Sequence, residues 1–409
     1  MWLYNLGISL YAGGIRLAAL WHGKARLWSE GRRNIFERME AAVRPSDRIV
    51  WVHAASLGEF EQARPIIERL RAEHPEYKIL LTFFSPSGYE IRKNYEGADY
   101  VFYLPADTPS NARRFLDIVH PEIAIFIKYE FWINLLSELR RRKVRSYIVS
   151  AIFRRNSVFF RPYGAMWRQA LETFDTLFVQ NVESKRLLSE IGFDNVVVAG
   201  DTRFDRVAQI AAAAQRVETI ERFRGGGRLF VAGSTWGPDE EILLPLVNAN
   251  PDVKFVIAPH EMDEGRIAHL MRNAKGGAVR YTQCDAATRF DDVQVLVLDT
   301  MGMLSSVYGS ATWAYVGGGF GVGIHNTLEA ATFGLPIAFG PNYGKFKEAR
   351  DMVSLGCAVS VRTAGELAAW FAPLRDDEET LRRASRTAKD YTARNQGATG
   401  IILRSIFNS

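Results

Sequence analysis

Short apolar runs alternate with amphipathic, helix-like stretches along most of the chain. In the first half, the runs expected to form strands are Ile49–Val52, Ile79–Phe84, Ile123–Ile127, Tyr147–Val149, Leu177–Val179 and Val196–Ala199. In the second half they are Leu229–Ala232, Phe255–Ala258, Ala278–Tyr281, Val293–Leu298, Trp313–Val316, Ile337–Phe339 and Ala358–Val361. Buried strands that alternate with helices predict an α/β fold with doubly wound parallel sheets.

A polar, helix-like segment from Arg203 to Arg224 is followed by three glycines and divides this pattern into two halves. We therefore expect two Rossmann-like domains facing a cleft, at residues 29–212 and 213–390. A last helix is expected at roughly Glu378–Ile406. The final segment, 391–409, could pack on its own domain or cross back to the first one.

Residues 1–28 differ in character from the rest of the chain. Met1–Trp21 contains one charged side chain, Arg16, and a basic stretch follows it (His22, Lys24, Arg26, Arg32 and Arg33). A secretory signal has its basic residues first. The apolar run is about as long as a membrane span, but Gly13, Gly14 and Arg16 weaken it as one. We predict an N-terminal membrane-associating helix lying in the interface, and the alternative is an ordinary helix covering the first domain.

The composition excludes only a few classes of function. The 409 residues are 47% hydrophobic and 24% charged, as in globular proteins, and the net charge of +5 permits anionic partners without identifying one. Cys284 and Cys357 have no metal-ligand spacing and fit a reducing compartment. Nucleic-acid binding is not expected, because the charge is not concentrated and no recognition motif is present.

The stretch Arg48–Phe60, RIVWVHAASLGEF, predicts a buried strand, a loop of small residues and a helix with apolar spacing from Glu61 to Arg71. Ligands of open α/β sheets bind outside the carboxyl ends of the strands. Glu59, behind Gly58, is therefore placed to act as a general base. The alternative is a first-turn glutamate that only complements the helix dipole.

A second pattern lies in the other half. Trp313–Gly319, WAYVGGG, predicts a strand that ends in three glycines, and His325–Ala331 predicts a helix start with Asn326 or Thr327 as its cap. Backbone N–H groups in such a turn can hold a phosphate, and Glu329 can accept hydrogen bonds from a ribose. GxGxxG followed by an acidic strand residue and GxxxxGK[ST] are both absent, which argues against a dinucleotide oxidoreductase and a P-loop NTPase.

The segment HNTLEAATFGLPIAFGP, at 325–341, resembles the donor-domain signature of GT-B glycosyltransferases. Together with HAASLGE at 53–59, it resembles the family of 3-deoxy-D-manno-octulosonic acid (Kdo) transferases of lipopolysaccharide synthesis. Further similar segments are spread along nearly the whole chain: Phe84–Gly88 (FSPSG), Tyr103–Asp107 (YLPAD), Glu130–Asn134 (EFWIN), Gly200–Asp205 (GDTRFD), Ala232–Thr235 (AGST) and Asp299–Leu304 (DTMGML) with Tyr308.

The resemblance implies a GT-B enzyme that transfers Kdo from CMP-Kdo to a lipid A precursor at the cytoplasmic face of the inner membrane. It implies inversion of the anomeric centre without a metal or other cofactor, with Glu59 as general base and Glu130 as a second catalytic carboxylate. The donor residues it implies, in the second domain, are Ser234, Thr235, Pro259, His260, Gly302, Met303, Gly317, Gly318, Gly319, His325, Asn326, Thr327 and Glu329. The acceptor residues, in the first domain, are Ser56, Gly58, Ser85, Ser87, Gly88, Arg154 and Arg155.

Three departures from the family pattern affect the donor side. The family usually has Gly-Gly-His-Asn-Pro where this chain has Gly323–Thr327, and Met-Gly-Glu-Leu where it has Met301–Leu304. A usual Pro-Arg-His stretch appears here as Pro259-His260-Glu261, so the partner of that arginine must be held by another group. The simplest interpretation is sequence variation between lineages. The alternative with a functional consequence is that this chain binds its donor differently.

Basic residues cluster at 140–145 and at Arg154, Arg155 and Arg161, the second group beside Phe153, Phe159, Phe160 and Tyr163. We interpret these aromatic and basic residues as a membrane edge that also contacts lipid phosphates, against the alternatives of ordinary surface charge and a hydrophobic core helix. Two other functions fit the pattern. One is a nucleotide-sugar 2-epimerase of the same fold, and the other is a sugar-nucleotide or lipid-binding protein without catalysis.

Overall fold

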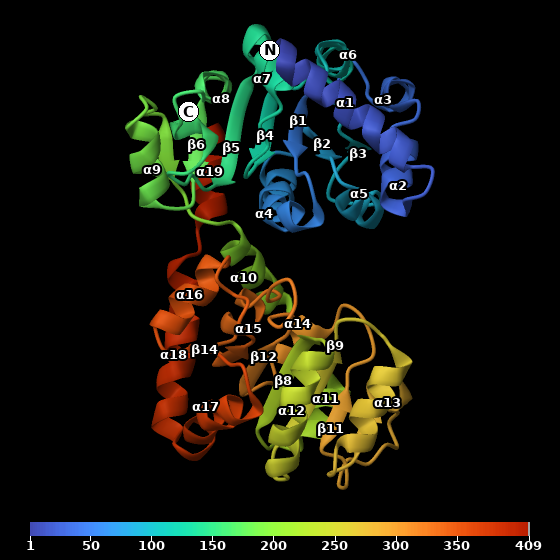
Figure 1. Cartoon of the computed structure of the whole chain (residues 1–409), viewed down its shortest axis with the longest axis vertical. Coiled ribbons are helices and arrows are strands. Elements are labelled where there is room, and N and C mark those ends of the chain that lie inside the picture. Colours follow the sequence, from blue (N-terminus) through green and yellow to red (C-terminus); the bar gives the residue numbers. More distant parts are fainter. Residues whose placement is uncertain (408–409) are drawn as a thin grey trace. The chain divides into compact units, whose positions relative to one another are not determined.

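The chain forms two compact units in the computed structural model, which describes residues 1–407 (Figure 1). The first unit contains Met1–Arg206 and the chain from Gln396 onward, and the second contains Val207–Asn395. Helix α10 (Arg203–Ala213) leads from the first unit into the second. The predicted final segment, 391–409, includes residues 408 and 409, which lie outside the described residues.

The first unit is built on a parallel sheet in the order β3-β2-β1-β4-β5-β6-β7. Its strands are β1 (Ile49–His53), β2 (Lys78–Phe83), β3 (Tyr100–Tyr103), β4 (Ile123–Ile127), β5 (Arg145–Ala151), β6 (Thr176–Val179) and β7 (Val196–Val198). Strands β1 and β4 are buried along their whole length, and they pair with His53 opposite Phe126. The strand order reverses between β1 and β4, so their carboxyl ends form the switch point at which open α/β sheets bind ligands.

Helices cover both faces of this sheet. They are α1 (Trp2–Ala18), α2 (Gly23–Gly31), α3 (Ile35–Ala42), α4 (Leu57–Glu73), α5 (Pro86–Arg92), α6 (Pro109–Val119), α7 (Ile133–Arg142), α8 (Ala165–Leu171), α9 (Val182–Ser189) and α19 (Ala398–Phe407), with a 3₁₀ turn at Val158–Phe160. One core packs α3, α6 and α7 against the sheet, and the other packs α4 and α19. None of the described helices is long and apolar enough to cross a bilayer, and the interfacial position of α1 stays a prediction.

The second unit repeats the architecture with the parallel order β10-β11-β9-β8-β12-β13-β14. Its strands are β8 (Leu229–Thr235), β9 (Lys254–Pro259), β10 (Ala278–Arg280), β11 (Val295–Val297), β12 (Trp313–Val316), β13 (Ile337–Phe339) and β14 (Ala358–Ser360). Its helices are α11 (Glu218–Arg224), α12 (Gly237–Ala249), α13 (Glu264–Asn273), α14 (Leu304–Tyr308), α15 (Leu328–Ala331), α16 (Lys347–Ser354), α17 (Ala364–Asp376) and α18 (Glu378–Arg394), with a 3₁₀ turn at Tyr281–Gln283. The prediction of two parallel, doubly wound α/β units is confirmed.

Two predicted helices are wrong in extent. The segment Arg203–Arg224 contains α10 and α11 with a break between them, and Glu378–Ile406 contains α18 and α19. The second break lies at Gly397, whose φ of +105° no other residue type adopts easily. The Asp205 carboxylate then accepts the backbone N–H groups of Gly397 and Thr399 at 2.6 and 2.7 Å, which ties the start of α19 to the first unit.

Candidate active site

Glu59 lies at the switch point of the first sheet, in the first turn of α4. The helix begins at Leu57, earlier than the apolar spacing from Glu61 predicted, and Ser56 is its N-cap residue. The Ser56 hydroxyl does not cap a backbone N–H; it donates to Glu59 Oε2 at 2.8 Å. Burial raises the pKa of Glu59, and the nearby charge of Glu130 raises it further. Glu59 is therefore a stronger base than an ordinary surface glutamate.

Glu130 follows β4 and is held by a buried chain of hydrogen bonds. It is 8% exposed, and its Oε2 lies 3.0 Å from His53 Nε2 and 2.7 Å from Trp132 Nε1. On the other side of the His53 ring, Nδ1 lies 2.8 Å from Thr82 Oγ1. Trp51 Nε1 donates to that same hydroxyl at 2.8 Å.

Each ring nitrogen of His53 has two polar partners. Nδ1 also lies 3.1 Å from the Thr82 carbonyl oxygen, and Trp132 Nε1 donates to Nε2 at 3.1 Å. The His53 ring is therefore fixed from both sides, between Thr82 on one side and Glu130 and Trp132 on the other. His53 is fully buried, so it orients Glu130 and is not itself placed to touch a substrate.

The other residues predicted on this side have varied surroundings. Ser85 is the N-cap of α5, and its hydroxyl accepts the Ser87 N–H at 3.3 Å. Gly58 is exposed, whereas Gly88 is buried against the Phe83 ring. Arg154 is exposed and lies near Tyr129. Burial raises the pKa of Tyr129, and the positive charge of Arg154 partly offsets this rise. Arg155 pairs with Glu190 at 2.9 Å on the surface.

The predicted membrane edge at 153–163 is wrong for two of its aromatic residues. Phe153 and Phe159 are 4% and 6% exposed and pack on each other and on Phe131 in the core. Tyr163, in contrast, is 76% exposed. The cluster at 140–145 is mostly ion-paired helix surface, with Arg140 on Glu172, Arg141 and Arg142 on Glu138, and Arg142 on Asp117.

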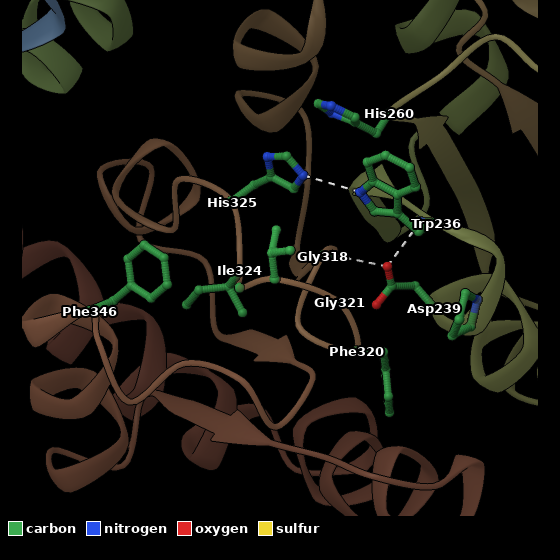
Figure 2. Close-up of a pocket in the computed structure, with 12 residues that line it drawn as sticks. Trp236, Asp239, His260, Gly318, Phe320, Gly321, Ile324, His325 and Phe346 are labelled. Atoms are coloured by element: carbon green, nitrogen blue, oxygen red, sulfur yellow. Dashed lines mark hydrogen bonds between the residues drawn. The ribbon is translucent and has the colours of Figure 1, made fainter. Parts of the chain in front are cut away.

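The second unit contains a pocket of about 560 Å³ beyond the ends of β8, β9 and β12 (Figure 2). Of the predicted donor residues, its lining includes His260, Gly318 and His325. The rest of the lining is Trp236, Pro238, Asp239, Phe320, Gly321, Val322, Gly323, Ile324 and Phe346. Most of these residues belong to the glycine-rich loop after β12 or to the start of α12.

Two histidines and a tryptophan form one wall of this pocket. The His260 and Trp236 rings stack with centroids 4.8 Å apart, and the His260 and His325 centroids are 4.4 Å apart. Trp236 Nε1 donates to His325 Nε2 at 3.3 Å, as Figure 2 shows. Burial lowers the pKa of His325, and the neighbouring His260 lowers it further. His325 is thus a neutral acceptor at neutral pH.

Asp239 holds the glycine-rich loop and was not predicted from the sequence. Its carboxylate accepts the N–H of Gly318 at 3.0 Å, the N–H of Trp236 at 2.9 Å and the Tyr315 hydroxyl at 2.7 Å. The glycines themselves are required by packing, since a Cβ on Gly317 would lie 2.2 Å from Ser234 O and one on Gly319 would lie 2.6 Å from the Gly340 Cα. The local signal for Asp239 was its position three residues after the α12 N-cap.

The remaining predicted donor residues lie outside the lining of this pocket. Asn326 Nδ2 donates to Glu329 Oε1 at 3.0 Å, and Ser305 donates to Glu329 Oε2 at 2.8 Å. Thr235 is buried and donates to Glu240. Ser234 and Pro259 lie in the last residues of β8 and β9, and Gly302 and Met303 precede α14. Thr327 is buried without a hydrogen-bond partner for its hydroxyl.

The predicted helix start at 325–331 is a single turn, α15, that begins at Leu328. Asn326 Oδ1 accepts the Leu328 N–H at 3.1 Å, whereas the side chain of the N-cap residue Thr327 makes no cap bond. A four-residue helix has only a weak dipole. A bound phosphate would therefore depend on loop N–H groups and imidazoles more than on this helix. Among residues 1–407, no cluster of three or more His, Cys, Asp or Glu side chains suits a metal ion.

Comparison with known proteins supports the family resemblance. Residues 32–206 match the family model for 3-deoxy-D-manno-octulosonic-acid transferase (kdotransferase). A 3-deoxy-D-manno-octulosonic acid transferase of Bordetella pertussis is 28% identical over 373 residues, 87% of this chain and 86% of the relative. The enzyme of the same name from Haemophilus influenzae is 25% identical over 378 residues, 88% of this chain and 86% of that relative. This chain is a relative of the Kdo transferases. The predicted resemblance is confirmed, and the Kdo transferase relatives indicate a glycosyltransferase.

Solved structures show the same two-unit fold. The UDP-GlcNAc 2-epimerase of Neisseria meningitidis bound to UDP-GlcNAc has a TM-score of 0.62 at 16% identity and covers 88% of this chain and 100% of its own. MurG of Acinetobacter baumannii has a TM-score of 0.55 at 13% identity, with 89% and 100% covered. These neighbours are GT-B-like, and at such identities they establish the fold without deciding between transfer and epimerisation.

Proposed function

We propose that this chain transfers Kdo from CMP-Kdo to a lipid A precursor of the lipid IVA type in lipopolysaccharide synthesis. The family relationship supports Kdo transfer. The observation that carries the mechanism is the pair Glu59 and Glu130 at the switch point of the first sheet. One carboxylate of this pair has a raised pKa, and the other is fixed by His53 and Trp132.

Glu59 is the general base of the proposed reaction. It takes the proton of the acceptor hydroxyl while the hydroxyl oxygen bonds to the anomeric carbon of Kdo. The bond from that carbon to the CMP phosphate oxygen breaks, and its electron pair leaves with CMP. A single displacement of this kind inverts the anomeric centre. A correctly placed base contributes roughly 10²–10⁴ in rate, and the raised pKa of Glu59 favours proton uptake.

The donor occupies the second unit in this proposal. The loop residues Phe320, Val322 and Gly323 and the imidazoles of His260 and His325 line the pocket in which a phosphate would be stabilised. Asn326 and Glu329 form a hydrogen-bonded polar pair suited to a ribose. No metal or other cofactor takes part in the proposed reaction, and CMP-Kdo is a substrate.

The acceptor is presented at the cytoplasmic face of the inner membrane. Helix α1 exposes Trp2, Leu3 and Leu10, and Trp21 is exposed in the turn that follows it, each by 67% or more, which suits a peripheral interfacial helix. Exposed Arg154 offers a charge for a lipid phosphate near Tyr129 and Glu130. Oligomeric state does not enter the proposal.

The test is transfer from CMP-Kdo, generated in situ, to a tetraacylated lipid A precursor in detergent, read by mass spectrometry. We compare wild type with Glu59→Gln, and use Glu61→Gln as the matched control. Glu61 lies on the same helix, is half-buried, and pairs with Arg92 at 3.4 Å and with Arg206 at 3.5 Å. Wild type should add one or more Kdo masses, Glu59→Gln should lose roughly a hundredfold or more in rate, and Glu61→Gln should stay close to wild type.

Each part of the proposal can fail separately. No Kdo mass with wild type would refute the reaction, and UDP-sugars would then be assayed for 2-epimerisation. Full activity of Glu59→Gln would keep the reaction but return Glu59 to a helix-terminal role. Equal losses in Glu59→Gln and Glu61→Gln would mean that the helix, and not the base, had been damaged.

A further inference from the structure

Helix α1 has two different faces. The outer face carries a stripe of exposed leucines at one helical spacing (Leu3, Leu6, Leu10 and Leu17, 73%, 43%, 67% and 61% exposed). The inner face places Tyr4, Asn5 and Ala12 against the first unit, with Tyr4 packed on the core beneath α7. The inner face has polar contacts that a helix serving only as a membrane anchor would not need.

The inner face completes the N-terminus of α7. The N-cap residue of α7, Trp132, supplies no side-chain acceptor. The first three N–H groups of the helix donate instead to side chains from distant segments: Ile133 to Tyr4 Oη (3.3 Å), Asn134 to Asp107 Oδ2 (3.0 Å) and Leu135 to Asp107 Oδ1 (2.9 Å). Tyr4 Oη in turn donates to Asp107 Oδ2 at 2.6 Å. These N–H groups have no intrahelical partner, so Tyr4 and Asp107 together cap α7 from outside.

Two further contacts reinforce the junction. Asn134 Nδ2 donates to Asn5 Oδ1 at 2.9 Å, which adds a second side-chain bond between α1 and the start of α7. On the next turns of α1, Tyr11 stacks on Phe84 with centroids 6.2 Å apart, and Phe84 packs on Trp132 at 4.6 Å. Helix α1 therefore contacts the turn before α7 through a polar route and an aromatic route.

Both routes end at Glu130. Trp132, which the cap and the Phe84 ring hold in place, donates its indole N–H to Glu130 Oε2 at 2.7 Å. Burial raises the pKa of Glu59, and the charge of Glu130 raises it further. Asp107 is 1% exposed, so solvent cannot replace the Tyr4 hydroxyl without rearrangement.

We propose that α1 is a positioning element of the acceptor site, in which Tyr4 fixes the start of α7 and thereby the Trp132–Glu130 hydrogen bond. The catalytic readout rests on the proposed function; the structural readout does not. Tyr4 touches no reacting atom and acts through Asp107 and Trp132. The segment that meets the lipid surface is then also the segment that sets the geometry beside Glu59.

Tyr4→Phe removes the hydroxyl and leaves the ring and the outer leucine stripe unchanged. We expect kcat to fall roughly tenfold or more, because small displacements of catalytic groups are costly, with KM for CMP-Kdo unchanged because the proposed donor residues lie in the other unit. The NMR signal of the Trp132 indole N–H, assigned with Trp132→Phe, should shift. Tyr100→Phe removes a β3 hydroxyl that donates to Asp47 at 2.5 Å, outside the proposed site, and should change neither quantity.

A second control separates positioning from membrane binding. Leu10→Ser should weaken binding to vesicles containing anionic phosphatidylglycerol but leave kcat in detergent and the Trp132 signal unchanged. Asn5→Ala, a milder change on the inner face, should shift the Trp132 signal in the same direction as Tyr4→Phe, and it replaces Tyr4→Phe if that variant does not fold.

Specific results would overturn the proposal. An unshifted Trp132 signal in Tyr4→Phe and Asn5→Ala would refute positioning, whatever the activity. Loss of activity in Leu10→Ser equal to that in Tyr4→Phe, both in detergent, would also refute it. If wild type transfers no Kdo, the proposed function fails, but the Trp132 signal still decides whether α1 positions the turn before α7.

Discussion

Glu59 differs from an ordinary glutamate at a helix N-terminus because of its neighbours. The helix dipole favours a negative charge in the first turn, yet the pKa of Glu59 is raised, first by burial and then by the charge of Glu130. Ser56, which an isolated helix would use as a cap, donates to the Glu59 carboxylate instead. A carboxyl group whose surroundings disfavour its charged form, and so raise its pKa, is typical of a proton acceptor in a functional site.

The raised pKa of Glu59 predicts that the Glu59→Gln substitution increases stability at neutral pH, whereas the same substitution should lower activity. The folded state favours the protonated form, so this group's contribution to stability is fully present below its ordinary pKa of 4.5 and is lost as pH rises through the raised folded value. Glu59→Gln should therefore have a higher free energy of unfolding than wild type at pH 7, and the difference should vanish near pH 4. Urea titrations at both pH values measure this. A lower stability of Glu59→Gln at pH 7 would contradict it.

The two imidazoles at the donor pocket predict a pH-dependent KM. This chain has His260 where the family usually has arginine, and the pKa of the adjacent His325 is lowered by burial and by His260. The His325 imidazolium loses its charge as pH rises through a range below its ordinary pKa of 6.5, so KM for the anionic donor should increase as pH rises toward 7. His260→Arg should lower KM several-fold at pH 8 and flatten its pH profile, because guanidinium stays charged. A wild-type KM that does not change with pH would refute this role of the histidines.

At the scale of elements, the sequence predicts the strands and helices that depend on neighbouring residues in the chain. Buried strands and their following helices are visible in the apolar pattern, which is why β1, α4 and the position of Glu59 could be predicted. Strand β3 was not predicted, although Tyr100–Tyr103 is an apolar run; it is a four-residue strand at the sheet edge, and its first half is only partly buried. Contacts between distant segments carry no local signal, so the roles of Asp107, which caps α7, and Asp239, which holds the glycine-rich loop, could not be predicted.

Asp239 joins two elements of the donor pocket, and its removal should affect both. In Asp239→Asn, the amide would place N–H groups opposite one or more of the donors from Gly318, Trp236 and Tyr315. We expect a loss of about 1–3 kcal/mol in the free energy of unfolding and a raised KM for CMP-Kdo, measured by chemical denaturation and initial rates. Asp252→Asn, at an exposed position in the same unit, should change neither. A change in stability without a change in KM would mean that the loop does not bind the donor.

At the scale of the whole molecule, the two units divide the proposed work. The first unit combines the carboxylate pair with α1, and the second contains the pocket lined by the glycine-rich loop. The two-unit fold follows from the alternation of strands and helices, but a UDP-GlcNAc 2-epimerase has this fold as well. Function therefore depends on particular residues at the carboxyl ends of the strands in the two sheets.

Binding to an anionic membrane should depend on where the positive charge lies and not only on how much there is. Arg16, Lys24 and Arg26 are exposed on or beside α1, and each basic residue near an anionic surface contributes about 1 kcal/mol. Replacing all three by alanine should weaken binding to phosphatidylglycerol vesicles roughly a hundredfold at low salt, and added salt should reduce this difference.

The matched control for this experiment replaces Arg382, Arg383 and Arg386, three exposed arginines of α18, by alanine. This variant has the same net charge as the first, so the chain's overall charge of +5 falls equally in both. Vesicle sedimentation should show strong binding by the α18 variant and weak binding by the α1 variant. Equal losses would mean that net charge alone attracts the protein to the membrane. No loss in either would remove electrostatics from the membrane contact and leave the exposed leucine stripe of α1 as its source.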